Sequence, residues 1–133
     1  VEDLLFIERF QPEMIGIGPF IPHHDTPFAG KAAGSMEMTL KLLSIFRLMH
    51  PKALIPSTTA LASLAPDGRI RGILAGANVV MPNLSPQEER KKYNLYNNKA
   101  SLGAESAEGL RILQQQLENI GYQISFSRGD YKQ

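Results

Sequence analysis

The sequence contains no cysteine. Disulfide bonds, thiolate metal sites and iron–sulfur clusters held by cysteine are therefore excluded within this chain. Neither sign of charge dominates: the net charge is +1. This gives no electrostatic basis for contact with nucleic acid or an acidic membrane. No hydrophobic run approaches the roughly 20 residues of a membrane-spanning helix, and no signal peptide is visible. We therefore expect a cytoplasmic protein.

The residues that are present suit one domain with its own core. The chain has 133 residues, of which 43% are hydrophobic, and this places it at the small end of α/β folds. Its first residues, Glu2 to Phe10, carry an apolar pattern typical of the end of a helix whose beginning is missing. From this abrupt start we expect the chain to be a piece of a longer protein.

The stretch from Met14 to Pro27 is the most informative part of the chain. It begins with a short apolar run, Met14–Ile17, that predicts a buried strand. Pro19, Pro22 and Pro27 then prevent a helix from starting, so the residues between them form an irregular loop with a fixed path. Parallel α/β proteins place their ligand sites on such loops, at the carboxyl ends of strands. We therefore expect this loop to cover a small-molecule pocket.

Strand and helix patterns alternate along the chain, which is typical of right-handed crossovers and a parallel sheet. The predicted strands are Met14–Ile17, Ala53–Ala60, Asn78–Pro82 and Tyr122–Phe126. The predicted helices are Glu2–Phe10, Met36–His50, Arg69–Ala75, one that opens at Ser85, and Ser106–Ile120. A closed barrel needs eight strands and roughly 250 residues. The chain is either a small open sheet or the last part of a larger barrel, and the abrupt start favours the barrel.

Polar groups follow the second and third predicted strands. The hydroxyls of Ser57–Thr59 either cap local backbone groups or bond a ligand at the rim of the sheet. Met81 and Asn83 end the third strand at the same rim. Tyr93 and Tyr96 are either core residues or lean over the same opening. No nucleophile–base pair or carboxylate pair stands out, so we assign no catalytic residue.

His23, His24 and Asp25 stand together in the predicted loop. They suggest a metal cluster, but adjacent histidines in an extended loop point in different directions and rarely bind one metal together. A solvated or hydrogen-bonded loop is the favoured interpretation. We therefore assign no metal ligands and expect the purified chain to retain no stoichiometric zinc.

Four segments together resemble the C-terminal part of radical S-adenosylmethionine (SAM) enzymes of the biotin synthase-like group. The similarity is greatest to the HydE family of iron–iron hydrogenase maturases, and biotin synthase departs from it more. The segments are Met14-Ile-Gly-Ile-Gly-Pro-Phe-Ile-Pro-His-His-Asp-Thr-Pro27, Ile55-Pro-Ser-Thr-Thr-Ala60, Asn78-Val-Val-Met-Pro-Asn83 and Arg128-Gly-Asp-Tyr131.

This resemblance implies an α/β fold that is part of a (β/α)8 TIM barrel. Residues 1–84 would supply strands six to eight. Residues 85–133 would form a helical and strand extension that closes the barrel, the domain associated with biotin and thiamine synthesis (BATS domain).

The resemblance also implies the chemistry of the whole protein. In that family a 4Fe–4S cluster on an early CxxxCxxC loop cleaves SAM to a 5′-deoxyadenosyl radical, and the substrate of the HydE family is thought to be a small organometallic iron complex. This chain lacks the cluster motif. We therefore expect the chain alone to be inactive and to bind neither cofactor. Its expected partners are the small-molecule substrate and the missing N-terminal half, and the exposed sheet of the isolated chain is expected to self-associate.

Carried over residue by residue, the resemblance assigns contacts with SAM to Pro19, Ile21 and Tyr93. It places the substrate cavity against Met14, Thr58, Thr59, Met81 and Tyr96. This chain departs from the family at His24, where relatives usually have proline, and it has no cysteine for an accessory cluster.

Two other functions remain open at this point. The chain could belong to a sulfur-inserting enzyme of the biotin synthase type, which the second-cluster ligands of the missing half would reveal. It could also be a non-catalytic α/β binding domain, which a complete natural chain that folds as a stable monomer would favour.

Overall fold

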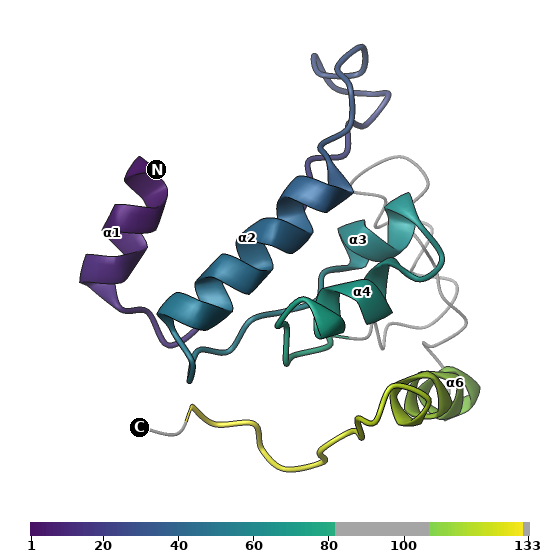
Figure 1. Ribbon diagram of the computed structural model, residues 1–133. Coiled ribbons are helices and arrows are strands. Elements are labelled where there is room, and N and C mark those ends of the chain that lie inside the picture. The colour runs from purple at the N-terminus through teal and green to yellow at the C-terminus, as the bar shows by residue number, and fades with distance from the viewer. Residues whose placement is uncertain (82–106, 132–133) are drawn as a thin grey trace.

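The computed structural model describes residues 1–81 and 107–131 (Figure 1). Over these ranges the helices are α1 (Glu2–Phe10), α2 (Met36–Met49), α3 (Thr59–Leu64), α4 (Gly68–Leu74) and α6 (Ala107–Glu118). Some predictions concern other residues. The boundary between 1–84 and 85–133, the helix that opens at Ser85, and both Tyr93 and Tyr96 lie outside the described residues.

Helix α2 forms where the sequence predicts it. The Ser35 hydroxyl accepts a hydrogen bond from the backbone N–H of Met38 at 3.2 Å and so caps the first turn. The buried side chains then recur every three or four residues on one face, at Thr39, Leu43 and Phe46. The helix ends at His50, whose N–H still bonds to the carbonyl of Phe46, and Pro51 follows. In Figure 1, α2 lies between α1 and the pair α3–α4.

Three extended segments lie side by side in the parallel order that the sequence predicts. Met14 forms a parallel bridge with Leu54, and Pro56 forms one with Val79. Each bridge carries a backbone hydrogen bond of 2.9 Å: Ile15 donates to Leu54, and Ser57 donates to Val79. The segment around Leu54 and Pro56 is therefore the central one.

The predicted strands themselves are not formed over the described residues, because two side chains interrupt the pairing. Leu54 donates its N–H to the carbonyl of Glu13 at 2.9 Å, but the next donor on that side would be Pro56, which has no N–H. On the other side, the N–H of Ile55 donates to Oδ1 of Asn78 at 2.8 Å instead of to a backbone carbonyl. The segments thus meet in isolated bridges rather than in continuous ladders.

The central segment also ends earlier than predicted. Thr58 is still extended, with ψ 154°, but α3 begins at Thr59, inside the predicted strand Ala53–Ala60. Helix α4 follows at once and packs on α3. Gly68 makes this possible, since a Cβ there would overlap the carbonyl of Leu61.

Two groups of buried side chains hold the elements together. The first lies between α2 and the extended segments and contains Ile15, Leu43, Phe46, Ala53, Ile55 and Leu61. The second joins α4 and α6 through Ile73, Ala77, Leu113 and Leu117. Helix α1 has no buried residue and presents the stacked rings of Phe6 and Phe10 to solvent.

The last predicted strand, Tyr122–Phe126, is wrong within the described residues. Gly121 ends the turn after α6 with φ +80°. The described residues beyond it form no strand with another segment. The N–H of Ile124 donates to the side chain of Gln114 at 3.0 Å, while Phe126 is 85% exposed. The alternating pattern therefore reflects one contact, of Ile124 with the second buried group, rather than a sheet.

The helices of the described ranges are all too short or too polar to cross a membrane.

Candidate ligand site at the carboxyl ends of the extended segments

The first and central segments approach each other closely beyond their bridge. A methyl group on Gly18 would lie 2.8 Å from Oγ1 of Thr58 and 3.3 Å from its Cγ2. Gly18 follows Met14 by as many residues as Thr58 follows Leu54, so the contact continues the parallel register. On the third segment, Met81 lies as many residues beyond the bridging Val79 as Thr58 lies beyond its partner Pro56. The sequence therefore brings residues from three segments toward one rim.

Thr58 is the unusual residue at this rim. It occupies the N-cap position of α3, yet its side chain makes no capping hydrogen bond. Its Oγ1 is buried and has no hydrogen-bond partner among the described residues. Buried hydroxyls are nearly always bonded, and an isolated one is a sign of a functional or ligand-facing group.

The neighbouring hydroxyl of Ser57 differs from that of Thr58. It is buried and donates to the carbonyl of Arg69 in α4 at 2.8 Å. The prediction that the hydroxyls of Ser57–Thr59 cap local backbone groups therefore fails for Thr58. The hydroxyl of Ser57 instead connects the central segment to α4. Thr59, the first residue of α3, is half-buried.

The remaining described residues of the predicted cavity are open to solvent. Met14 is 45% exposed and Met81 is 57% exposed, whereas Ile15 beside Met14 is buried in the first core group. The first segment thus has one covered face and one open face. Apolar side chains on the open face offer a surface on which an apolar ligand group or another part of a protein could pack.

The loop after the first segment is closed at its base. The N–H of Gly34 donates to the carbonyl of Phe20 at 2.7 Å, and a Cβ on Gly34 would lie 2.8 Å from the Phe20 nitrogen. Pro19, which lies just before this closure, is buried. Ile21, which lies just inside it, is half-buried. The rest of the loop projects beyond the N-terminal end of α2 (Figure 1).

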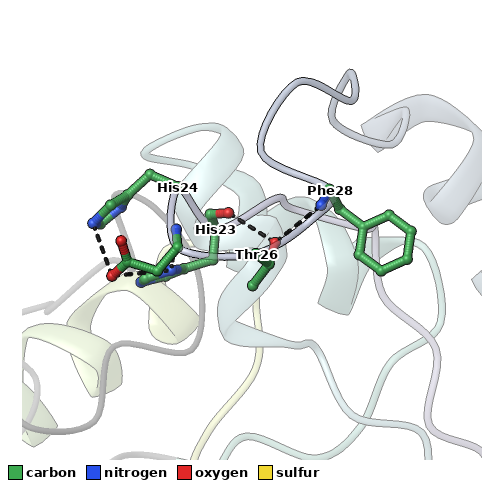
Figure 2. Close-up of polar contacts among 5 residues, drawn as sticks. His23, His24, Thr26 and Phe28 are labelled. Atoms are coloured by element: carbon green, nitrogen blue, oxygen red, sulfur yellow. Dashed lines mark hydrogen bonds and ion pairs between the residues drawn. The ribbon is translucent and has the colours of Figure 1, made fainter.

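The His23–Asp25 part of this loop differs from the prediction. The two imidazole rings do not diverge: they stack with centroids 4.3 Å apart and an angle of 24° between their planes. Oδ2 of Asp25 lies 3.3 Å from Nε2 of His24 and 3.9 Å from Nδ1 of His23, and Figure 2 shows the two histidines beside Thr26. The prediction assumed an extended loop, but a turn closed by Thr26 brings the three side chains together.

Two cavities of about 280 Å³ each lie away from the rim. One lies beside the amino ends of the first two segments and includes Gln11 and Lys52, and the other lies beside α6. Neither contains a residue that the sequence assigned to the site. The exposed side chains of Met14 and Met81 lie outside both cavities.

The rim offers binding groups rather than acid–base chemistry. Its described members, Met14, Pro19, Thr58 and Met81 among them, carry no ionisable side chain. Burial lowers the pKa of Arg47, which lies in α2 and not at this rim. The rim could position a ligand by one hydroxyl and by apolar contact, while any reactive group would have to come with the ligand or from outside this rim.

Sequence reasoning missed the close contact between Gly18 and Thr58, which depends on segments far apart in the chain. It also missed the convergence of the two histidines. The sequence does hold a signal for the second, because Asp25 and Thr26 are residue types that favour tight turns.

No family model matches the chain. Among known proteins, the [FeFe] hydrogenase maturase subunit HydE of Thermotoga maritima is 39% identical over 121 residues, which is 91% of this chain and 35% of HydE. The 3-methylornithine synthase of Methanosarcina barkeri is 37% identical over 78 residues, or 59% of this chain and 22% of that protein. That of Methanosarcina acetivorans is 32% identical over 80 residues, or 60% of this chain and 22% of that protein.

A solved structure agrees with these sequence relatives. The crystal structure of methylornithine synthase (PylB) superposes with a TM-score of 0.62 and 28% identity, over 93% of this chain and 36% of that one. The chain spans only about a third or less of the length of the relatives that it matches. The resemblance predicted from the sequence is confirmed: the chain is related to the C-terminal part of a radical SAM enzyme close to HydE.

Proposed function

We propose that this chain forms one wall of the SAM and substrate site of a HydE-like enzyme that matures the cofactor of [FeFe] hydrogenase. The observation that carries the proposal is the buried hydroxyl of Thr58 at the carboxyl end of the central segment, which has no hydrogen-bond partner among residues 1–81 and 107–131. It supports a ligand role because such a group is costly to leave without a partner. The match to HydE over most of the chain supports the choice of enzyme.

In this proposal the three extended segments are strands six to eight of a (β/α)8 barrel that the whole protein completes. Their carboxyl ends are where barrel enzymes bind their ligands. Residues 85–133 would close the barrel as the C-terminal extension. The neighbouring strands of the whole protein would pair with the outer edges of the first and third segments.

The rim suits the two ligands in different ways. Pro19 and Ile21 would form the apolar contact with the adenosyl group of SAM, and Thr58 would donate or accept one hydrogen bond with a ligand. Met14 and Met81 would form apolar walls, and Thr59, Tyr93 and Tyr96 complete the proposed set.

The 4Fe–4S cluster and the radical chemistry belong to the rest of the protein in this proposal. The chain has no cysteine, so the cluster ligands must lie elsewhere. The cluster supplies the electron that cleaves SAM, and the residues described above bind, orient and exclude water. The isolated chain should therefore produce no 5′-deoxyadenosine from SAM and reductant, and measurable 5′-deoxyadenosine would contradict this division of roles.

We propose that the remainder of the protein covers the open apolar surfaces. Met14, Met81 and the stacked pair Phe6–Phe10 are all exposed in this chain. When the chain is alone, we expect copies of it to associate through these surfaces and to bury of the order of 1,000 Å² or more per contact. Light scattering measures this, and a clean monomer at high concentration would count against it.

A methylornithine synthase-like mutase is the second candidate. The structural match to PylB over 93% of this chain favours it. The sequence match to 3-methylornithine synthase covers only 59% of the chain, against 91% for HydE, and so the maturase remains the first choice. The two differ in substrate, so assays of the full-length protein with each substrate class separate them.

The test of the proposed site is Thr58→Val in the full-length protein that carries this sequence. Valine has the shape of threonine without its hydroxyl, so the fold should be as stable or slightly more stable, because an unbonded buried hydroxyl is removed. Affinity for SAM or substrate should fall about tenfold, as expected for the loss of one good hydrogen bond of about 1.4 kcal/mol.

The matched control is Thr39→Val. Thr39 is also a buried residue, but its hydroxyl donates to the carbonyl of Ser35, the N-cap of α2, at 3.0 Å. This variant should lose stability and keep full ligand affinity, the reverse of Thr58→Val. Unchanged affinity and activity in Thr58→Val would remove the main support for the site.

A further inference from the structure

The turn His23–Asp25 brings three metal-ligating side chains within reach of one another. The candidate ligand atoms of His23, His24 and Asp25 all lie within 4.8 Å of one another. All three come from one short stretch of the loop, and the Asp25 carboxylate lies within 4 Å of both imidazoles. The proposed function assigns no role to these three residues of the loop.

The distances fit the space around a transition-metal ion. With bonds of about 2.1 Å, two ligands of a tetrahedral or octahedral ion lie roughly 3.0 to 3.4 Å apart. Oδ2 of Asp25 and Nε2 of His24 are 3.3 Å apart, which already matches. Nδ1 of His23 is 3.9 Å from the same oxygen, a gap that a small side-chain rotation closes.

The turn holds these groups before any ion binds. The Thr26 hydroxyl donates to the carbonyl of His23 at 2.8 Å, and the Phe28 N–H donates back to that hydroxyl at 3.3 Å. The N–H of Asp25 donates to Nδ1 of His23 at 3.1 Å, and a metal ion bound at this nitrogen would take the place of that hydrogen bond. Preorganisation of this kind lowers the entropic cost of binding.

Exposure and charge also suit a cation. The His23 side chain is 15% exposed and serves as the anchor, while those of His24 and Asp25 are 69% and 76% exposed and leave a path for the ion and its remaining water ligands. Two neutral imidazoles and one carboxylate give the donor set a charge of −1. Mixed nitrogen and oxygen donors select zinc, nickel or copper over magnesium or calcium, which prefer oxygen alone.

We propose that His23, His24 and Asp25 bind one divalent transition-metal ion of the zinc, nickel and copper group. The ion is held by Nε2 of His24, Oδ2 of Asp25 and one nitrogen of His23, and water completes its coordination. Bound there, it fixes the turn that follows Ile21. The inference rests on the geometry of the loop and is independent of the proposed enzymatic function.

The test is a titration of the untagged 133-residue chain with Zn²⁺ against a chromophoric chelator. We expect one saturable site per chain. His24→Phe keeps an aromatic ring for stacking on His23 but removes the nitrogen, and Asp25→Asn keeps the shape of the side chain but removes its charge. Each should weaken Zn²⁺ binding at least tenfold, since even outer-shell partners of metal sites are worth about 10- to 100-fold.

The matched control is Asp67→Asn. Asp67 is an exposed aspartate at the start of α4, and its side chain makes no capping hydrogen bond. Its replacement should leave the affinity for Zn²⁺ unchanged within about twofold, while far-UV circular dichroism confirms that all variants keep their helices. An equal loss of affinity in Asp67→Asn would show non-specific binding and overturn the proposal.

A second readout uses Cu²⁺ and electron paramagnetic resonance. The spectrum of the parent chain should show two coordinating nitrogens, and that of His24→Phe should show one. The proposal is overturned if Zn²⁺ binding does not saturate at one ion per chain, if both loop variants bind as tightly as the parent chain, or if the copper spectra of parent and His24→Phe coincide.

Discussion

Gly18 lies against the side chain of Thr58, at a distance that leaves no room for a methyl group: a Cβ would be 2.8 Å from the Thr58 oxygen. Gly18→Ala should therefore force the first and central segments apart. We expect a loss of about 1 to 3 kcal/mol in the free energy of unfolding, as for overpacking of a tight contact.

Gly16→Ala is the control for this substitution, because a Cβ on Gly16 would meet no atom within 4 Å. Its stability should change by no more than about 0.5 kcal/mol. Urea denaturation measures both. Equal midpoints for the two variants would show that the segments separate at no cost, and would argue against a built rim.

A second prediction concerns Gly76, at the junction between α4 and the third segment. Its φ is +117°, and a Cβ would lie 2.7 Å from Cβ of Arg47, whose Nε donates to the Gly76 carbonyl at 2.8 Å. Gly76→Ala should cost backbone strain and steric overlap together, about 2 to 4 kcal/mol in all.

Gly121→Ala separates these two effects. Gly121 has φ +80° but no atom within 4 Å of an added Cβ, so its substitution should cost the backbone strain alone, about 1 kcal/mol. Thermal unfolding of both variants gives the difference. If Gly76→Ala were no more damaging than Gly121→Ala, Arg47 would not restrict this position.

A third prediction concerns the hydroxyl of Ser57, which bonds to the carbonyl of Arg69 at 2.8 Å inside the protein. Ser57→Ala removes the donor and should cost about 1 to 2 kcal/mol of stability. The exposed Ser125 serves as the control, and its alanine variant should stay within about 0.5 kcal/mol. A Ser57→Ala variant as stable as Ser125→Ala would mean that this bond does not hold the segment to α4.

A fourth prediction concerns how α6 attaches to the rest of the chain. Leu113 is 3% exposed and packs with Ile73 and Ala77, so Leu113→Ala should cost about 2 to 5 kcal/mol. Ile112 on the same helix is 47% exposed, and its alanine variant should be close to neutral. Hydrogen exchange of the α6 amides should accelerate only in the first variant. Similar exchange in both would show that α6 is not anchored by this cluster.

The sequence predicted α1, α2, α4 and α6 well because their signals are local, but it missed the short helix α3. Ser35 before an apolar period and Pro51 after it define α2, and Gly121 closes the turn beyond α6. The parallel order of the extended segments also followed, since helices between strands favour crossovers.

The strands and the site could not be predicted as far, because they depend on contacts across the chain. Nothing local to Asn78 shows that its amide replaces a backbone acceptor for Ile55. Pro56 does indicate an irregularity in the strand, but not that the missing donor would face the first segment. The unbonded state of the Thr58 hydroxyl likewise depends on what surrounds it in space. The prediction that the two histidines point in different directions was wrong because it assumed an extended chain where Thr26 closes a turn.

The two parallel bridges also bear on the order in which the chain folds. The bridge between Pro56 and Val79 closes a shorter loop than the bridge between Met14 and Leu54, and short loops cost less entropy to close. We expect the central and third segments, with α3 and α4 between them, to form the folding nucleus, and the Met14 segment to dock later. Substitution of Ile73 should then slow folding, whereas substitution of Ile15 should mainly speed unfolding.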